Sequence, residues 1–184
     1  MSLAIVIAFS AGVLLWTLLE YLLHRWVFHV RVLGKRLARE HTRHHAQVDW
    51  FAPWWIKLGV AAPILLALAA VAMWLTGAPG AALATGTFTG WIVYEVIHRR
   101  IHVAAPRNGY ARWARAHHLS HHFGKVHSNH GVSSPIWDHV FGTFVAPGVI
   151  TVPRQHAPKF PWLVEQRDGK AAVRAAYEGA YRVA

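Results

Sequence analysis

Three long apolar runs constrain the fold of this chain more than any other feature. Residues 3–19 and 58–75 carry no charged side chain, and residues 81–94 begin a third run that continues towards His102. A helix of this length can cross the hydrocarbon core of a bilayer. The sequence therefore predicts an all-α integral membrane protein with about three transmembrane helices, at residues 3–28, 56–75 and 81–102. A signal peptide is the alternative for the first run, but no basic residue precedes it.

The distribution of charge predicts how these spans are oriented. The formal net charge is +11, and lysines and arginines follow the first and third spans, whereas the 76–80 turn has none. Cationic loops favour the cytoplasmic side, so we expect residues 29–53 and 103–184 to form a cytoplasmic cap, on the inner membrane if the protein is bacterial. Because the charges flank apolar runs, they favour a membrane over nucleic acid as the partner. We expect residues 1–184 to form a single membrane-embedded domain.

Histidines are concentrated in four short clusters at the cap ends of these spans. The second and fourth clusters repeat a spacing of i, i+3 and i+4, and the third has i, i+4, so each would present one imidazole face on a helix. Residues five apart do not share a face, so the first cluster can act as one unit only if its helix ends or distorts. The candidate metal ligands are His24, His29, His41, His44, His45, His98, His102, His118, His121 and His122.

Composition limits which metals this site could hold. The chain has no cysteine, which excludes thiolate sites. It has only eight acidic residues and a single Glu-x-x-His motif, at residues 95–98, whereas a ferritin-like di-iron site needs two such motifs. Ten imidazoles exceed the capacity of one metal and suit two, with iron, zinc, copper or nickel favoured over magnesium or calcium. We expect Glu20, Glu95 and Asp138 to accept hydrogen bonds from ligating imidazoles. The roles of four further histidines stay open: His117, His127, His130 and His139.

The order and spacing of these clusters resemble the fatty acid hydroxylase superfamily of membrane di-iron enzymes. The superfamily pattern HxxxxH, HxxHH, HxxxH, HxxHH occurs here in that order, and residues 20–25 and 131–143 resemble the fatty acid and ceramide 2-hydroxylase branch. The resemblance implies that the ten histidines bind two iron ions. It also implies an oxygen-dependent monooxygenase that hydroxylates a lipid acyl chain of the fatty acid or ceramide type.

The sequence also departs from that branch. The branch has four spans in two hairpins, so three spans would leave the N-terminus outside the cytoplasm. No cytochrome-b5-like segment is recognised, so we expect a separate electron donor such as a ferredoxin or a cytochrome b5-like protein. Zinc could replace iron in the purified protein. A carotenoid ring hydroxylase, a lipid or sterol desaturase and, more distantly, a metal-binding transport protein could use the same histidines.

The remaining segments carry weaker patterns. Residues 111–123 predict a helix on the cytoplasmic surface, after a break at residues 106–109 that contains proline and glycine. Residues 124–152 are predicted to be irregular. Residues 171–183 predict a short amphipathic C-terminal helix.

Overall fold

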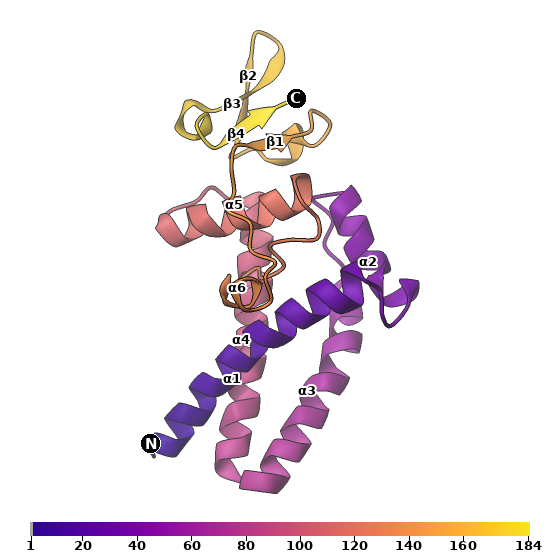
Figure 1. Ribbon diagram of the computed structural model, residues 1–184, viewed down its shortest axis with the longest axis vertical. Coiled ribbons are helices and arrows are strands. Elements are labelled where there is room, and N and C mark those ends of the chain that lie inside the picture. Colours follow the sequence, from indigo (N-terminus) through magenta and orange to yellow (C-terminus); the bar gives the residue numbers. More distant parts are fainter. Residues whose placement is uncertain (1) are drawn as a thin grey trace.

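The computed structural model describes residues 2–184, and their fold is mostly helical (Figure 1). Helix α1 (Leu3–Leu22) continues without a break into a π-helix, η1 (Leu23–His29), while α3 (Trp54–Thr76) and α4 (Ala78–Val103) form a hairpin that turns at Gly77. Two stretches, Leu3–His29 and Trp54–Thr76, are long and apolar enough to cross a membrane. Helix α4 is equally long, but polar residues lower its hydropathy, so its role as a third span stays a prediction.

Glycines allow α1 and α4 to cross at close range. A Cβ atom added to Gly12 of α1 would lie 2.1 Å from the carbonyl oxygen of Leu83, and one added to Gly86 of α4 would lie 2.1 Å from that of Phe9. Each backbone therefore occupies the space that a side chain would need. This crossing fixes the direction of α1 and therefore the position of the π-helix η1, which continues from it and contains His24 and His29.

Helices α2 (Lys35–Ala46) and α5 (Gly109–Phe123) lie beyond the upper end of the hairpin, with α5 crossing the end of α4 (Figure 1). The structure confirms the predicted helix over residues 111–123. Asn108 caps α5 by accepting a hydrogen bond from the amide of Ala111. The buried guanidinium of Arg115 donates to the carbonyl oxygens of Arg100 and Ala104, which ties α5 to the C-terminus of α4.

The C-terminal segment forms strands, so the helix predicted over residues 171–183 is wrong and the fold is not entirely helical. Strand β1 (Ile150–Val152) pairs in parallel with β4 (Tyr181–Val183), and β2 (Val164–Arg167) pairs antiparallel with β3 (Lys170–Val173). Asp168 and Gly169 both have positive φ angles at the hairpin turn, a conformation that favours an Asp-Gly pair. Short helices complete the chain: α6 (Ile136–Val140), η2 (Ala157–Lys159) and η3 (Ala175–Tyr177).

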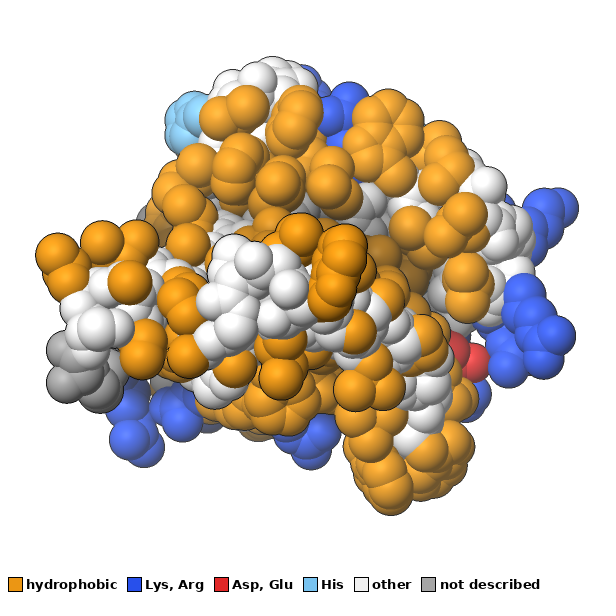
Figure 2. Space-filling model, turned by 90° about the horizontal axis from the view of Figure 1, so that it is seen from below, with side chains coloured by type: hydrophobic (Ala, Val, Ile, Leu, Met, Phe, Trp, Pro, Cys, Tyr) orange, Lys and Arg blue, Asp and Glu red, His pale blue; other side chains and the backbone are white. Residues whose placement is uncertain are grey.

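The buried apolar side chains form two separate clusters, the smaller of which joins Trp16 of α1, Ala61 of α3 and Trp91 of α4. The larger one packs Leu119 and Ile101 from the helices against Phe160 and Leu163 of the C-terminal segment. Large apolar side chains of α1 and α3 remain exposed, including Leu66 and Trp74. Figure 2 shows this lower face as mostly hydrophobic, with lysines and arginines at its margin. A lipid environment would remove this apolar surface from water.

The close crossing of α1 and α4 generates a prediction about stability. Gly12→Ala would push a methyl group into the backbone of α4, so we expect it to destabilise the fold by about 1–3 kcal/mol. Gly59→Ala on α3 is the matched control, because a Cβ there meets nothing within 4 Å. Thermal unfolding in detergent should show a lower melting temperature for Gly12→Ala alone. Equal melting temperatures for the two variants would contradict the packing described.

Candidate metal centre

The ten predicted histidines lie together as two groups of five. Within each group, one ring nitrogen of every histidine lies within 4.8 Å of those of the other four. The first group contains His24, His29, His41, His45 and His121. The second group contains His44, His98, His102, His118 and His122.

The two groups share helices but divide the sequence clusters between them. Helices α2 and α5 each contribute to both groups, whereas η1 serves only the first and α4 only the second. The rings of His45 and His122 stack at the junction, with centroids 4.1 Å apart. The adjacent sites are therefore held by the same pair of helices.

The π-helix explains how two histidines five residues apart enter one group. In a π-helix each amide bonds to the carbonyl five residues earlier, as the amide of Val30 does to Arg25. This winding brings residues i and i+5 onto one face, and the Nε2 atoms of His24 and His29 lie 3.3 Å apart. Of the two conditions under which this cluster could act as one unit, the structure shows that the helix distorts and does not end.

The spacing between ring nitrogens fits shared metal ligation. Neighbouring Nε2 atoms lie 2.9 to 3.3 Å apart in the first group and 3.0 to 3.1 Å apart in the second. Metal–nitrogen bonds of about 2.1 Å place adjacent ligand nitrogens roughly 3 Å apart. The two groups therefore could each hold one metal ion.

Backbone carbonyls set the tautomers of three of these imidazoles. Nδ1 of His24 donates to the carbonyl oxygen of His130 at 2.5 Å, and Nδ1 of His44 donates to the carbonyl oxygen of Trp50 at 2.7 Å. Nδ1 of His121 likewise donates to the carbonyl of Ser128 at 2.7 Å. Because a carbonyl oxygen can only accept, the proton lies on Nδ1 and the lone pair of Nε2 points into the group.

Burial keeps the imidazoles of the cap neutral. It lowers the pKa of His44 to about 4 and that of His45 to about 3, and in the latter case neighbouring histidines add repulsion. Burial and adjacent imidazoles also hold the pKa of His118 and His121 well below its usual range. Neutral imidazole is the form that binds a metal, so these side chains are ready to ligate at physiological pH.

The three predicted carboxylates do not accept hydrogen bonds from these ten imidazoles, which corrects the role expected of them. Glu20 accepts from the amides of Val132 and Ser133, at 2.6 and 2.7 Å, and from the Ser133 hydroxyl. Glu95 pairs with Lys57. Carbonyl oxygens take the orienting role instead, and no sequence motif marks a carbonyl.

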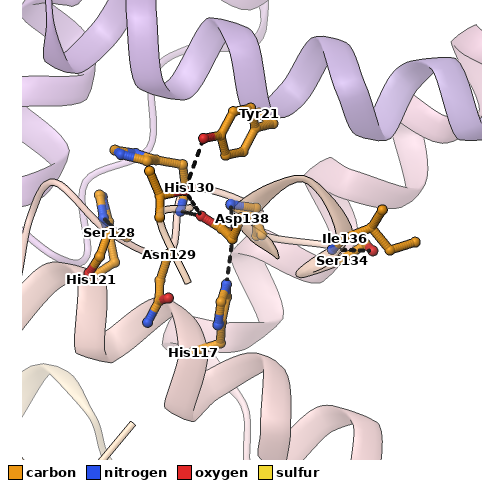
Figure 3. Close-up of polar contacts among 12 residues, drawn as sticks. Tyr21, His117, His121, Ser128, Asn129, His130, Ser134, Ile136 and Asp138 are labelled. Carbon is orange, nitrogen blue, oxygen red and sulfur yellow. Dashed lines mark hydrogen bonds and ion pairs between the residues drawn. The ribbon is translucent and has the colours of Figure 1, made fainter. Parts of the chain in front are cut away.

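Asp138 acts on the site indirectly, through the loop that follows α5. Its carboxylate accepts from the amides of His130 and Gly131 at 2.7 and 2.8 Å, and from Nε2 of His117 at 3.1 Å (Figure 3). Asp138 is fully buried, and burial alone would raise its pKa. The pKa nevertheless lies below its usual value, because the hydrogen bonds from His117, the two amides and the Thr143 hydroxyl outweigh that effect. Asp138 therefore holds the loop whose His130 carbonyl orients His24.

The histidines with open roles occupy different environments. His117 belongs to neither group: its Nε2 bonds to Asp138 and its ring stacks on Trp113. His130 is buried beside the first group, with its ring centroid 5.4 Å from that of His24 and edge-on to Tyr21. His139 stacks on Phe144, and His127 is exposed.

A cavity of about 370 Å³ lies beside the second group, among α1, α2, α3 and α4. His41, His44 and His98 form part of its wall. Apolar side chains line the end among the membrane helices, including Ile64 and Trp91. An apolar ligand bound in this cavity would lie next to histidines of both groups.

Comparison with known proteins gives consistent matches over most of the chain. A family model described as fatty acid hydroxylase matches residues 9–143. The chain is 31% identical over 154 residues to the dihydroceramide fatty acyl 2-hydroxylase FAH2 of Arabidopsis thaliana, covering 80% of this chain and 63% of that protein. It is 28% identical over 143 residues to the human fatty acid 2-hydroxylase, covering 73% of this chain and 38% of the relative.

A solved structure described as full-length scs7p, with only the hydroxylase domain visible, has a TM-score of 0.65 and 27% identity. The match covers 78% of this chain and 57% of that one. The chain thus spans less than two thirds of the length of these relatives.

The two groups of histidines predict the number of metal ions bound. We expect the purified protein to bind two equivalents of zinc or iron per chain, measured by elemental analysis, because each group offers five convergent nitrogens. His121→Ala should lower the content by up to one equivalent. His156→Ala is the control, because His156 lies outside both groups. Unchanged metal content in both variants would contradict the assignment of ligands.

Proposed function

This chain belongs to the fatty acid hydroxylase family, and from that premise we propose that it hydroxylates the acyl chain of a membrane lipid of the fatty acid or ceramide type. The names of its relatives support attack at carbon 2 of the acyl chain. The observation that carries the proposal is the largely apolar cavity beside two groups of five convergent imidazoles. Such a site would bring a redox metal next to a hydrocarbon chain.

We assign the ten histidines as ligands of two iron ions. When bound, iron supplies the activation of molecular oxygen that a hydroxylation of an unactivated carbon requires. The residues of this chain would orient the metal ligands and keep water away from the acyl chain. Carbonyl partners fix the tautomers of His24, His44 and His121, and the cavity excludes water from the acyl chain.

The reaction also needs a reductant, and we propose a separate electron-transfer protein, a ferredoxin or a cytochrome b5-like protein. Zinc can occupy the same imidazole sites in a purified sample, so activity requires iron to be supplied. Glu20, Glu95 and Asp138 remain candidates for indirect roles, through the loops and the cation that they contact.

We further propose that α4 is a third span and that residues 1–184 form one membrane-embedded domain. The exposed apolar side chains of α1 and α3 and the packing of α4 between them support this arrangement. Lysines and arginines of α2 and of the α4–α5 connection support a cytoplasmic location for the histidine groups.

Lipid analysis tests the proposed activity. Cells expressing this chain with iron and a reductase should accumulate a lipid class that gains one oxygen atom, detected by comparative mass spectrometry. The variants His118→Ala, His121→Ala and His122→Ala should each lose at least 99% of that product while still inserting into the membrane. His156→Ala, outside both groups, should retain it.

Other outcomes would identify a different reaction. A loss of two hydrogens would indicate a desaturase, and an oxygenated ring in a carotenoid-producing host would indicate a carotenoid hydroxylase. Activity that survives in all three alanine variants would refute the assignment of the site. Metal uptake into vesicles without lipid oxidation would favour a transport protein.

A further inference from the structure

The cavity beside the second histidine group changes character along its length. Its membrane end is apolar, with Ile64 and Leu65 from α3 and Trp91 from α4. Successive turns of α4 then present Trp91, Glu95 and His98 to the same cavity. A charged residue, Glu95, therefore lies between the apolar part of the cavity and the part lined by histidines.

Glu95 forms an ion pair that joins the two helices of the hairpin, α3 and α4. Lys57, near the start of α3, donates from its ammonium group to the Glu95 carboxylate of α4. Both residues line the cavity, and their side chains are only 26% and 24% exposed. Among residues 2–184, Glu95 is the only hydrogen-bond partner found for Lys57, so two of its three ammonium protons remain available.

The other charged residues that line the cavity are already engaged or lie at its outer end. Glu20 is bonded to the amides of Val132 and Ser133, and Glu40 accepts from Arg39 and from the Trp50 indole. Arg36 is exposed on α2. Lys57 is thus the cation placed at the junction between the apolar and histidine-lined parts.

We propose that Lys57, oriented by Glu95, binds the carbonyl oxygen of the acyl substrate and thereby determines which carbon faces the histidine groups. The inference rests on the proposed function and adds a positioning residue to it. Glu95 and His98 are three residues apart, which is about 4.5 Å along the helix axis. An acyl group whose oxygen is held here has the carbon next to its carbonyl beside His98, while the rest of the chain extends into the apolar end.

This placement fits a reaction close to the polar end of the lipid. Apolar walls alone would let an acyl chain slide, because methylene groups are equivalent in a hydrophobic cavity. A charge-assisted hydrogen bond at one fixed depth removes that freedom. The recognised chemistry is a carbonyl oxygen, which amides and carboxylic acids share, and separate probes distinguish these sources.

A binding experiment separates this role from that of a structural tie between α3 and α4. Zinc-loaded protein in detergent, without a reductant, would be titrated with hexadecanamide, hexadecanoic acid or hexadecane, and thermal stabilisation measured. In Lys57→Met we expect roughly tenfold or more hexadecanamide to be needed for half-maximal stabilisation, as for loss of a charged hydrogen bond. Hexadecane, which has no carbonyl, should stabilise the variant and the unaltered protein equally.

Lys159→Met provides the matched control. It removes a lysine from another ion pair, with Asp49 at 2.6 Å on the cap surface, outside this cavity. We expect it to respond to all probes as the unaltered protein does. If the natural ligand is a free carboxylate, Lys57→Met should lower the affinity for hexadecanoic acid more than the affinity for hexadecanamide. An equal loss of affinity for the two probes would indicate a neutral amide.

Product analysis gives a second readout. Iron-loaded Lys57→Met should spread the hydroxyl group over carbons beyond the one next to the carbonyl. If Lys57→Met does not retain zinc, Lys57→Gln is used in both measurements in place of Lys57→Met. Because the glutamine amide keeps a hydrogen-bond donor, we expect a smaller loss of hexadecanamide affinity in this variant.

Either of two results for Lys57→Met would overturn the inference. In the first, the binding of hexadecanamide and that of hexadecane are weakened to the same extent. In the second, the binding of both is unchanged and the hydroxyl group is still confined to one carbon. Absence of any hydroxylated lipid with the unaltered protein would count against the proposed function instead. The binding comparison would still decide the role of Lys57.

Discussion

Ten imidazole rings packed side by side must keep their inward nitrogens free of protons, and the rest of this structure serves that requirement. Burial disfavours the protonated form of the cap histidines, and carbonyl oxygens of Trp50, Ser128 and His130 place the remaining proton on the outward nitrogen. A carbonyl can only orient a ring if its own loop is held in place. The geometry of the two histidine groups therefore depends on irregular segments as much as on helices.

Those segments are held by buried carboxylates that never contact the ten rings. Asp138 binds two successive amides of the loop after α5, and Glu20 of α1 binds the next two. A charged acceptor forms a stronger hydrogen bond than a neutral one, and two parallel amides fix the direction of the chain. Because Glu20 lies one turn before His24, the same contact joins α1 to the loop whose carbonyl orients His24.

The position of the site relative to the apolar helices follows from two close contacts of α4. Glycines bring α1 against one side of this helix, which sets where the π-helix emerges. At its C-terminus, Arg115 binds the free carbonyls of α4, and the Trp162 indole donates to the carbonyl of His102. These contacts hold the C-terminal segment against the end of α4 that contains His102. The cavity lies on the other side of the second histidine group, between α1 and α3.

The long helices and the identity of the clustered histidines could be predicted from the sequence, because both are local properties. Hydrophobic runs and i, i+3, i+4 spacings follow from helical geometry. The five-residue spacing of His24 and His29 required a helix that ends or distorts if both were to enter one group, and the π-helix shows which of these occurs. The division of α2 and α5 between two groups, the carbonyl partners and the Lys57–Glu95 pair join residues far apart in the chain. The C-terminal strands were also missed, although Asp168-Gly169 is a hairpin signal, because β1 and β4 are stable only as partners. Only the tertiary structure decided these features, since each depends on which surfaces meet after the helices have packed.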